Sequence, residues 1–262
     1  MTDDAHGTDR APKGSLGRQY HIKVAPGEVG GVALMPGDPF RVQLIADKLD
    51  DPVEVAHARE YRTVVGSYKG IQVTAMSTGI GCPSAAIAVE ELARCGVHTF
   101  IRVGSTAALR ADVAVGDLVV NTGSYRNDGT SLAYAPLGYP AVPDTELTMA
   151  LMQVARETAL ARDIRLHVGI NVSDDAFYAE GPTWLARMTG LGLLNVEMES
   201  SAVFTVARLR GLRAGMICGV SGNLVANASE YSGEGENTRL AAGWEHSIDI
   251  ALEAAYRMAP AG

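Results

Sequence analysis

The chain has 262 residues, 47% of them hydrophobic, so it is long enough to bury one sizeable core, and a single domain is expected. A formal net charge of −8 argues against nucleic-acid binding, which usually requires a clustered positive field. Three cysteines without metal-ligand spacing, and no apolar run of the ~20 residues that span a bilayer, favour a cytoplasmic protein that does not enter a membrane.

Residues 1–18 mix charged residues with glycine and proline and contain no apolar segment, which indicates a disordered leader before a folded domain at 19–262. Beyond them, short apolar runs alternate with segments whose apolar residues recur at helical spacing. Strands are predicted at residues 32–35, 71–76, 99–103, 118–121, 167–172 and 214–220. Helices are predicted at residues 39–48, 83–95, 145–160, 198–210 and 239–258.

This alternation predicts an α/β fold, with a mixed central β-sheet flanked by helices on both sides. Ligand groups in such sheets gather at the loops beyond the strand ends. Two segments lack a period: residues 125–144, rich in proline, predict a long irregular excursion, and the polar residues 226–237 predict a mobile flap over a site.

An anion site is predicted where the first strand meets the first helix. Gly37 and Pro39 at this junction leave backbone N–H groups free at the helix entrance, and Arg41 adds a cation one turn inside. Gly-Asp-Pro is also a common turn sequence, so an ordinary turn is the alternative.

Two further stretches place charges at the ends of predicted elements. Arg102 lies in an apolar strand that ends near Ser105, and a buried guanidinium needs a partner, which predicts an anion unless Arg102 is exposed at a strand edge. Glu197 and Glu199 flank Met198 where a helix begins. They either cap the helix, or hold the hydroxyls of a ribose against the methionine.

Six motifs together resemble one family. They are, in chain order, Met35-Pro36-Gly37-Asp38-Pro39, His57-Ala58-Arg59-Glu60-Tyr61, Ser77-Thr78-Gly79-Ile80-Gly81-Cys82-Pro83-Ser84, Arg102-Val103-Gly104-Ser105, Asp175-Ala176-Phe177-Tyr178 and Glu197-Met198-Glu199. From about residue 21 to its final helix, the chain resembles the nucleoside phosphorylases that include uridine phosphorylase and the hexameric bacterial purine nucleoside phosphorylases. The resemblance implies their fold and the reversible phosphorolysis of a (deoxy)ribonucleoside to a free base and a pentose 1-phosphate.

The resemblance also implies residue roles. Phosphate, the co-substrate, would be bound by Gly37, Arg41, Arg102 and Ser105, and by Arg59 of a neighbouring subunit. Ribose would be held by Glu199, with Glu197 and Met198 beside it, and by His21 of the neighbour. Arg102, Arg41 and Glu199 are the implied catalytic residues. No organic cofactor is implied.

A subunit interface follows from the same resemblance. A site that borrows residues from its neighbour needs at least a dimer, and a hexamer built as a trimer of dimers is expected. Glu60, Ile80 and Ser84 match positions that hold a monovalent cation, potassium, at the dimer interface of uridine phosphorylases.

Base recognition is where the chain departs from this family. Gly181 and Thr183 stand where uridine phosphorylases carry a glutamine and an arginine, and Gly222 stands where the purine enzymes carry an aspartate. The predicted base pocket comprises Phe177, which either stacks on a base or packs in the core, with Gly181, Thr183 and Asn223. Glu180 and Asp174 are further candidates.

The first half of the chain is more similar to uridine phosphorylases than to the purine enzymes, so we expect a uridine phosphorylase-like enzyme with an altered base pocket. The alternatives are a purine nucleoside phosphorylase, a nucleosidase that uses water, and a noncatalytic nucleoside-binding protein. Retention of the three arginines argues against a nucleosidase, which has no phosphate to bind.

Overall fold

The computed structural model describes residues 17–226, 228–229 and 238–259. The strands are β1 (Val32–Met35), β2 (Asp50–Ala58), β3 (Tyr61–Tyr68), β4 (Ile71–Met76), β5 (Thr99–Ala108), β6 (Leu118–Asn127), β7 (Leu166–Asp174), β8 (Asn195–Glu197), β9 (Arg213–Asn223) and β10 (Ala228–Ser229). The helices are α1 (Pro39–Ala46), α2 (Cys82–Cys95), α3 (Gly129–Tyr134), α4 (Thr145–Arg162), the 3₁₀ turn η3 (Phe177–Ala179), α5 (Pro182–Gly190), α6 (Ser200–Leu209) and α7 (Thr238–Met258).

All the described strands join one mixed sheet in the order β10-β9-β6-β7-β8-β5-β1-β4-β3-β2. Strand β5 also pairs with β9, so the pairings of β5, β9, β6, β7 and β8 close into a ring. The central strand β5 runs parallel to both β1 and β9, whereas its pairing with the short β8 is antiparallel. The predicted mixed α/β fold is therefore confirmed.

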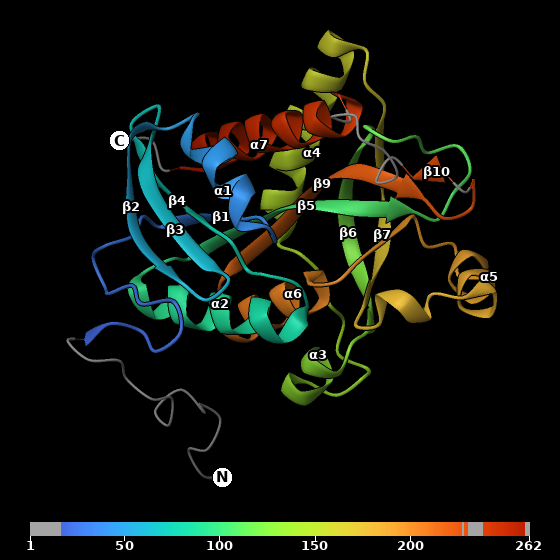
Figure 1. Cartoon of the computed structure of the whole chain (residues 1–262), viewed down its shortest axis with the longest axis horizontal. Helices are drawn as coiled ribbons and strands as arrows, with labels where there is room; N and C mark the ends of the chain where they lie inside the picture. The colour runs from blue at the N-terminus through green and yellow to red at the C-terminus, as the bar shows by residue number, and fades with distance from the viewer. Residues whose placement is uncertain (1–16, 227, 230–237, 260–262) are drawn as a thin grey trace.

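Helices cover both faces of the sheet (Figure 1). On one face α2 and α6 build a core around Val89 and Phe204. On the other face α1, α4 and α7 build a second core around Ile45, Leu151 and Ile250. No helix in the described ranges has both the length and the apolar character needed to cross a membrane.

The six predicted strands and five predicted helices are all present, with ends that shift by a few residues. Strands β2, β3, β8 and β10 and helices α3 and α5 were not predicted. β2 is the edge strand of the sheet and is exposed along its first five residues, so it lacks the apolar run that marks a buried strand.

The irregular excursion predicted at residues 125–144 is wrong in its first half, where β6 continues to Asn127 and α3 follows. The buried guanidinium of Arg126 organises this segment. It donates to the Ser131 hydroxyl at 2.9 Å and to the backbone carbonyls of Ser131, Ala135, Pro136 and Tyr139 at 2.5–2.7 Å. One side chain thus satisfies the carbonyl groups of a loop that has few internal backbone bonds.

Two predicted segments lie largely outside the described residues. Of the leader predicted at 1–18, only Gly17 and Arg18 are described, and Arg18 forms an ion pair with Glu28. Of the flap predicted at 226–237, only Ala226 and the short β10 are described.

The contact between β9 and α7 predicts a stability effect at Gly219. A Cβ atom at this residue would lie 3.1 Å from the backbone carbonyl carbon of Gly243 in α7. We expect Gly219→Val to push the helix off the sheet and to lower the free energy of unfolding by about 1–3 kcal/mol, as measured by urea denaturation.

The matched control is Gly138→Val, because Gly138 is exposed and an added Cβ would meet nothing within 4 Å. Equal unfolding free energies for the two variants would contradict the close β9–α7 contact.

Candidate active site

A cavity of about 1110 Å³ opens at the carboxyl ends of β1, β8 and β9 and along the second half of β5. Eleven of the sixteen residues predicted from the sequence line it: Gly37, Arg41, Ile80, Arg102, Ser105, Phe177, Gly181, Glu197, Met198, Glu199 and Asn223. The parallel strands β1, β5 and β9 bring their carboxyl ends to the same sheet edge, and the antiparallel β8 lies against the end of β5, so segments distant in sequence converge there.

The entrance of α1 forms one wall of this cavity. Asp38 caps the helix by accepting from the Phe40 backbone N–H at 2.9 Å, and Pro39 occupies the first turn. Gly37 lies so close to the Gly79 carbonyl oxygen that an added Cβ would approach it to 3.2 Å. The segment is therefore a tight turn, and it also lines the predicted anion site.

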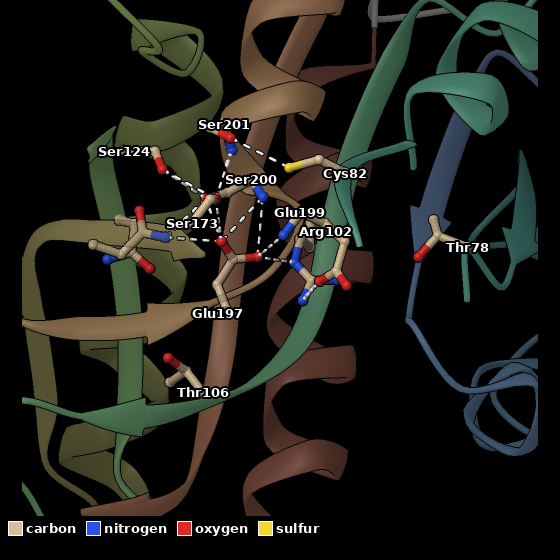
Figure 2. A network of polar contacts seen from close by, with 12 residues as sticks. Thr78, Cys82, Arg102, Thr106, Ser124, Ser173, Glu197, Glu199, Ser200 and Ser201 are labelled. Atoms are coloured by element: carbon tan, nitrogen blue, oxygen red, sulfur yellow. Dashed lines mark hydrogen bonds and ion pairs between the residues drawn. The ribbon is translucent and has the colours of Figure 1, made fainter. Parts of the chain in front are cut away.

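Arg102 lies buried between two carboxylates. Its Nε donates to Oε2 of Glu197 at 2.7 Å, and its Nη2 forms an ion pair with Oε2 of Glu199 (Figure 2). Burial alone would lower the pKa of Arg102, but the charges of the two carboxylates raise it by more, so the net shift of the pKa is upward. Its Nη1 has no hydrogen-bond partner in the described part of the chain, which leaves one donor for a bound anion.

Glu197 acts as the support of Arg102. Its carboxylate accepts from the side chains of Asn171, Ser173 and Ser200 at 2.6–3.0 Å, and from the backbone N–H groups of Glu199 and Ser200 (Figure 2). Burial would raise its pKa, but Arg102 and these hydrogen bonds lower it. The helix-capping interpretation is thus confirmed for Glu197, whose oxygens are fully engaged.

Glu199 is in a different situation from Glu197. Its Oε1 accepts from the Gly81 backbone N–H at 2.7 Å, and its Oε2 contacts Arg102. Burial raises the pKa of Glu199, Arg102 opposes that rise and Glu197 reinforces it. Glu199 lines the cavity beside Met198 and makes fewer hydrogen bonds than Glu197, so it is the carboxylate suited to accept from ligand hydroxyls.

Trp244 in α7 joins the site, and sequence reasoning missed it. Its indole Nε1 donates to the Ser105 hydroxyl at 2.8 Å, and the Arg41 guanidinium lies 5.4 Å from its ring centroid. Arg41 also donates to the Val103 carbonyl at 3.5 Å. A tryptophan at an apolar position of a predicted helix is normally interpreted as a packing residue. The sequence around Trp244 therefore gave no indication of its contacts with Arg41 and Ser105.

Three of the four predicted base-binding residues line the cavity, and one does not. Phe177 is 60% exposed at the cavity, which excludes core packing for it. Gly181 also lines the cavity, whereas Thr183 is exposed on α5 and does not. Asn223 lines it too, but its amide donates to the carbonyls of Arg110 and Val113 and accepts from two backbone N–H groups, so it anchors the loop after β9.

The residues expected from a neighbouring subunit lie outside the cavity of this chain. Arg59 is exposed at the β2–β3 turn, where its φ is +56°. His21 is held by Glu91 of α2, with 2.6 Å between Nδ1 and Oε1. Neither residue reaches the cavity in this chain, a placement that suits donation to a second copy.

Glu60 and Ser84, two of the three predicted cation ligands, are in contact. The Ser84 hydroxyl donates to Oε1 of Glu60 at 2.8 Å, and Ile80 between them in sequence is 79% exposed. Burial would raise the pKa of Glu60, but hydrogen bonds and the nearby Arg59 lower it, so the carboxylate is ionised. The described residues contain no cluster of three or more His, Cys, Asp or Glu suited to a metal, so a cation here would need hydroxyl and carbonyl oxygens.

Comparison with known proteins identifies the class. Residues 32–253 match the model of the phosphorylase superfamily. The chain is 51% identical to a guanosine phosphorylase of Halorubrum lacusprofundi, over 80% of this chain and 86% of that protein. It is 38% identical to the uridine phosphorylase of Escherichia coli, over 91% of this chain and 97% of that protein.

The solved structures agree. A crystal structure of uridine phosphorylase from Vibrio fischeri superimposes with a TM-score of 0.85 at 35% identity, covering 93% of this chain and 99% of that one. The chain therefore belongs to the phosphorylase superfamily, as a pentosyltransferase of its nucleoside phosphorylase family.

The position of Trp244 predicts a role in phosphate affinity. Trp244→Phe keeps a ring beside Arg41 but removes the donor to Ser105, and we expect the KM for phosphate to rise about 5-fold, since one hydrogen bond is worth about 1 kcal/mol. Trp244→Ala removes both contacts, so the rise should be at least ~10-fold. Initial rates at varied phosphate and saturating nucleoside measure both effects.

Trp184→Phe is the matched control, because Trp184 is the other tryptophan of the chain and donates to Asp174 rather than to Ser105. A phosphate KM that changes equally in Trp244→Phe and Trp184→Phe would refute the role.

Proposed function

We propose that the chain catalyses the reversible phosphorolysis of a nucleoside to a free base and a pentose 1-phosphate, with a uridine phosphorylase-like phosphate and ribose site and an altered base pocket. The observation that carries this proposal is Arg102, a buried cation with one donor nitrogen that has no partner among the described residues, next to the Glu199 carboxylate in one cavity. A cation and a carboxylate side by side suit a phosphate and the hydroxyls of the ribose whose anomeric carbon the phosphate attacks.

The chemistry follows from the charges. Cleavage of an N-glycosidic bond builds positive charge on the sugar ring, so a phosphate held under the anomeric carbon both attacks and stabilises that charge. Arg41 and Arg102 would orient the phosphate, with Ser105 and the Gly37 backbone beside them. Glu199 would fix the ribose hydroxyls, while Glu197 keeps Arg102 in place.

Guanosine and uridine are the first substrates to test. Relatives of this chain are named guanosine phosphorylase and uridine phosphorylase. Gly181 and Thr183 lack the side chains that read uracil in the family, which favours guanosine. The amide of Asn223 is engaged with backbone groups, so we now assign it to shaping the pocket.

A panel of nucleosides incubated with and without phosphate tests the function. We expect base release that depends on phosphate and yields equimolar pentose 1-phosphate, measured by chromatography. Equal release without phosphate would indicate the nucleosidase alternative, and tight binding without turnover would indicate the noncatalytic one. Comparable release of adenine, hypoxanthine and guanine, without release of uracil, would favour the purine nucleoside phosphorylase.

The proposal includes a homo-oligomer, with a dimer as the minimum and a hexamer as the full assembly. Arg59 is exposed at the β2–β3 turn and His21 lies outside the cavity, so both are available to a neighbour. Val53, Phe40 and Ile80 are large apolar side chains that are 59–79% exposed, as expected of residues that a second copy covers.

Subunit sharing predicts complementation between two inactive variants. Arg102→Ala should lose ~10²-fold or more in turnover because it removes a charge-assisted contact to phosphate. Arg59→Ala should be impaired in the neighbouring site. In a co-expressed mixture, each mixed dimer carries one intact site, so activity should return to about one quarter of the wild type.

The matched control mixes Arg102→Ala with Arg41→Ala, since both residues belong to the same chain's site and no intact site can form between them. Recovery in this control, or none in the Arg102/Arg59 mixture, would refute the shared site.

A monovalent cation completes the proposal. Glu60 and Ser84 supply adjoining oxygens, and Ile80 a neighbouring backbone carbonyl, so a potassium ion shared with a second copy would hold the two β2–β3 turns together. Its contribution would be structural. The nucleoside panel repeated with tetramethylammonium in place of potassium should show weaker activity, and identical rates would refute the ion.

The buried, free cysteines suit a cytoplasmic enzyme.

A further inference from the structure

The base end of the cavity is formed by a different part of the chain from the phosphate end. Once the residues around Arg102, Arg41 and Glu199 are set aside, the remaining wall comes from η3 and the start of α5, and from the end of β9. Phe177, Pro182, Leu185 and Leu224 make this wall largely apolar. Such a wall accepts the flat face of any base, so discrimination depends on its few polar groups.

Most polar side chains at this end are already engaged. Asn223 makes four hydrogen bonds to backbone groups. Asp174 accepts from Asn127, from the Trp184 indole at 2.8 Å and from the Ala176 backbone at 2.9 Å. Ser221 donates to the Thr106 carbonyl at 3.2 Å.

Glu180 is the exception. It lines the cavity and is half-buried, and it forms no hydrogen bond or ion pair with any residue of the described ranges. It directly precedes Gly181, the position at which the family's uracil-reading glutamine is missing. A carboxylate half-removed from water without a partner is unfavourable, so a ligand with suitable donors gains from meeting it.

We propose that Glu180 reads the base and selects guanine, by accepting hydrogen bonds from its N1–H and 2-amino groups. This inference rests on the proposed nucleoside phosphorolysis and names the base that the site takes.

The selection follows from the pattern of donors on each base. An ionised carboxylate offers two acceptors and no donor, and guanine is the common base with two parallel N–H donors on one edge. Uracil has a single N3–H between two carbonyl oxygens, and hypoxanthine lacks the 2-amino group. Adenine places a ring acceptor beside its amino group. Each of these would leave one carboxylate oxygen facing an acceptor or nothing.

The electrostatics of the site agree with this assignment. Burial and the neighbouring Asp174 carboxylate raise the pKa of Glu180 to about 7. Two N–H groups donated by a ligand favour the ionised form of a carboxyl group. The free energy that is lost when Glu180 is buried without a partner is therefore partly recovered when guanine binds.

The test is a comparison of guanosine, inosine and uridine, each with phosphate, between the wild type and Glu180→Gln. We expect the wild type to prefer guanosine. The glutamine replaces one acceptor by a donor, so kcat/KM for guanosine should fall about 10²-fold, because hydrogen bonds to a charged group are among the stronger ones. The values for inosine and uridine should fall far less, and the guanosine-to-inosine ratio should approach one.

Glu146→Gln, the same change at an exposed residue of α4 outside the cavity, is the matched control and should leave all three values unchanged. An equal loss for all three nucleosides in Glu180→Gln, an unchanged guanosine value, or a wild type that prefers uridine would each overturn the assignment while leaving phosphorolysis intact.

A failure of the proposed function is recognised separately, as a wild type that releases no base from any nucleoside. Calorimetric titration with free guanine and hypoxanthine then decides the role of Glu180 without turnover. Guanine binding that weakens about 10²-fold in Glu180→Gln supports the assignment, and binding that is unchanged overturns it.

Discussion

The site depends on one buried guanidinium held between two carboxylates. Burying three charges is costly, and it is tolerated only where each charge has partners of good geometry. Glu197 meets this condition because its carboxylate accepts hydrogen bonds from Asn171, Ser173, Ser200 and the first backbone N–H groups of α6. Held in this way, Glu197 fixes the position of Arg102. Breaking such a pair typically costs about 3–5 kcal/mol. The proposed catalytic cation is therefore part of the core rather than of a loop.

The two carboxylates differ in pKa and in hydrogen bonding because their surroundings differ. Glu197 has its oxygens saturated and a lowered pKa, whereas Glu199 has a raised pKa and faces the cavity. The other end of the cavity, where we propose that the base binds, is built separately on η3 and α5, with Phe177 exposed and Glu180 half-buried. Residues on such a surface segment change without disturbing the strands that position the charges, which allows one scaffold to take different bases.

How far the sequence predicts this structure is clear from particular residues. Val32 to Met35, an apolar run before Gly37 and Pro39, predicted β1 and α1 correctly because both signals are local. Strand β2 was missed because its pairing with β3 is nonlocal and its residues are exposed. The end of β6 and helix α3 were missed because this segment is organised by Arg126, which reaches carbonyls up to thirteen residues away.

By itself, the sequence determined the α/β class, the family and eleven of the residues that line the cavity, because strand and helix periodicity and short motifs depend on residues close together in the chain. Only the tertiary structure decided what those residues do. It separated Glu197 from Glu199, brought Trp244 of α7 to Ser105 of β5, engaged Asn223 and Asp174, and left Glu180 without a partner in the part of the chain that the structure describes. The physical reason is that hydrogen-bond satisfaction and burial depend on groups far apart in the chain, which no local pattern records.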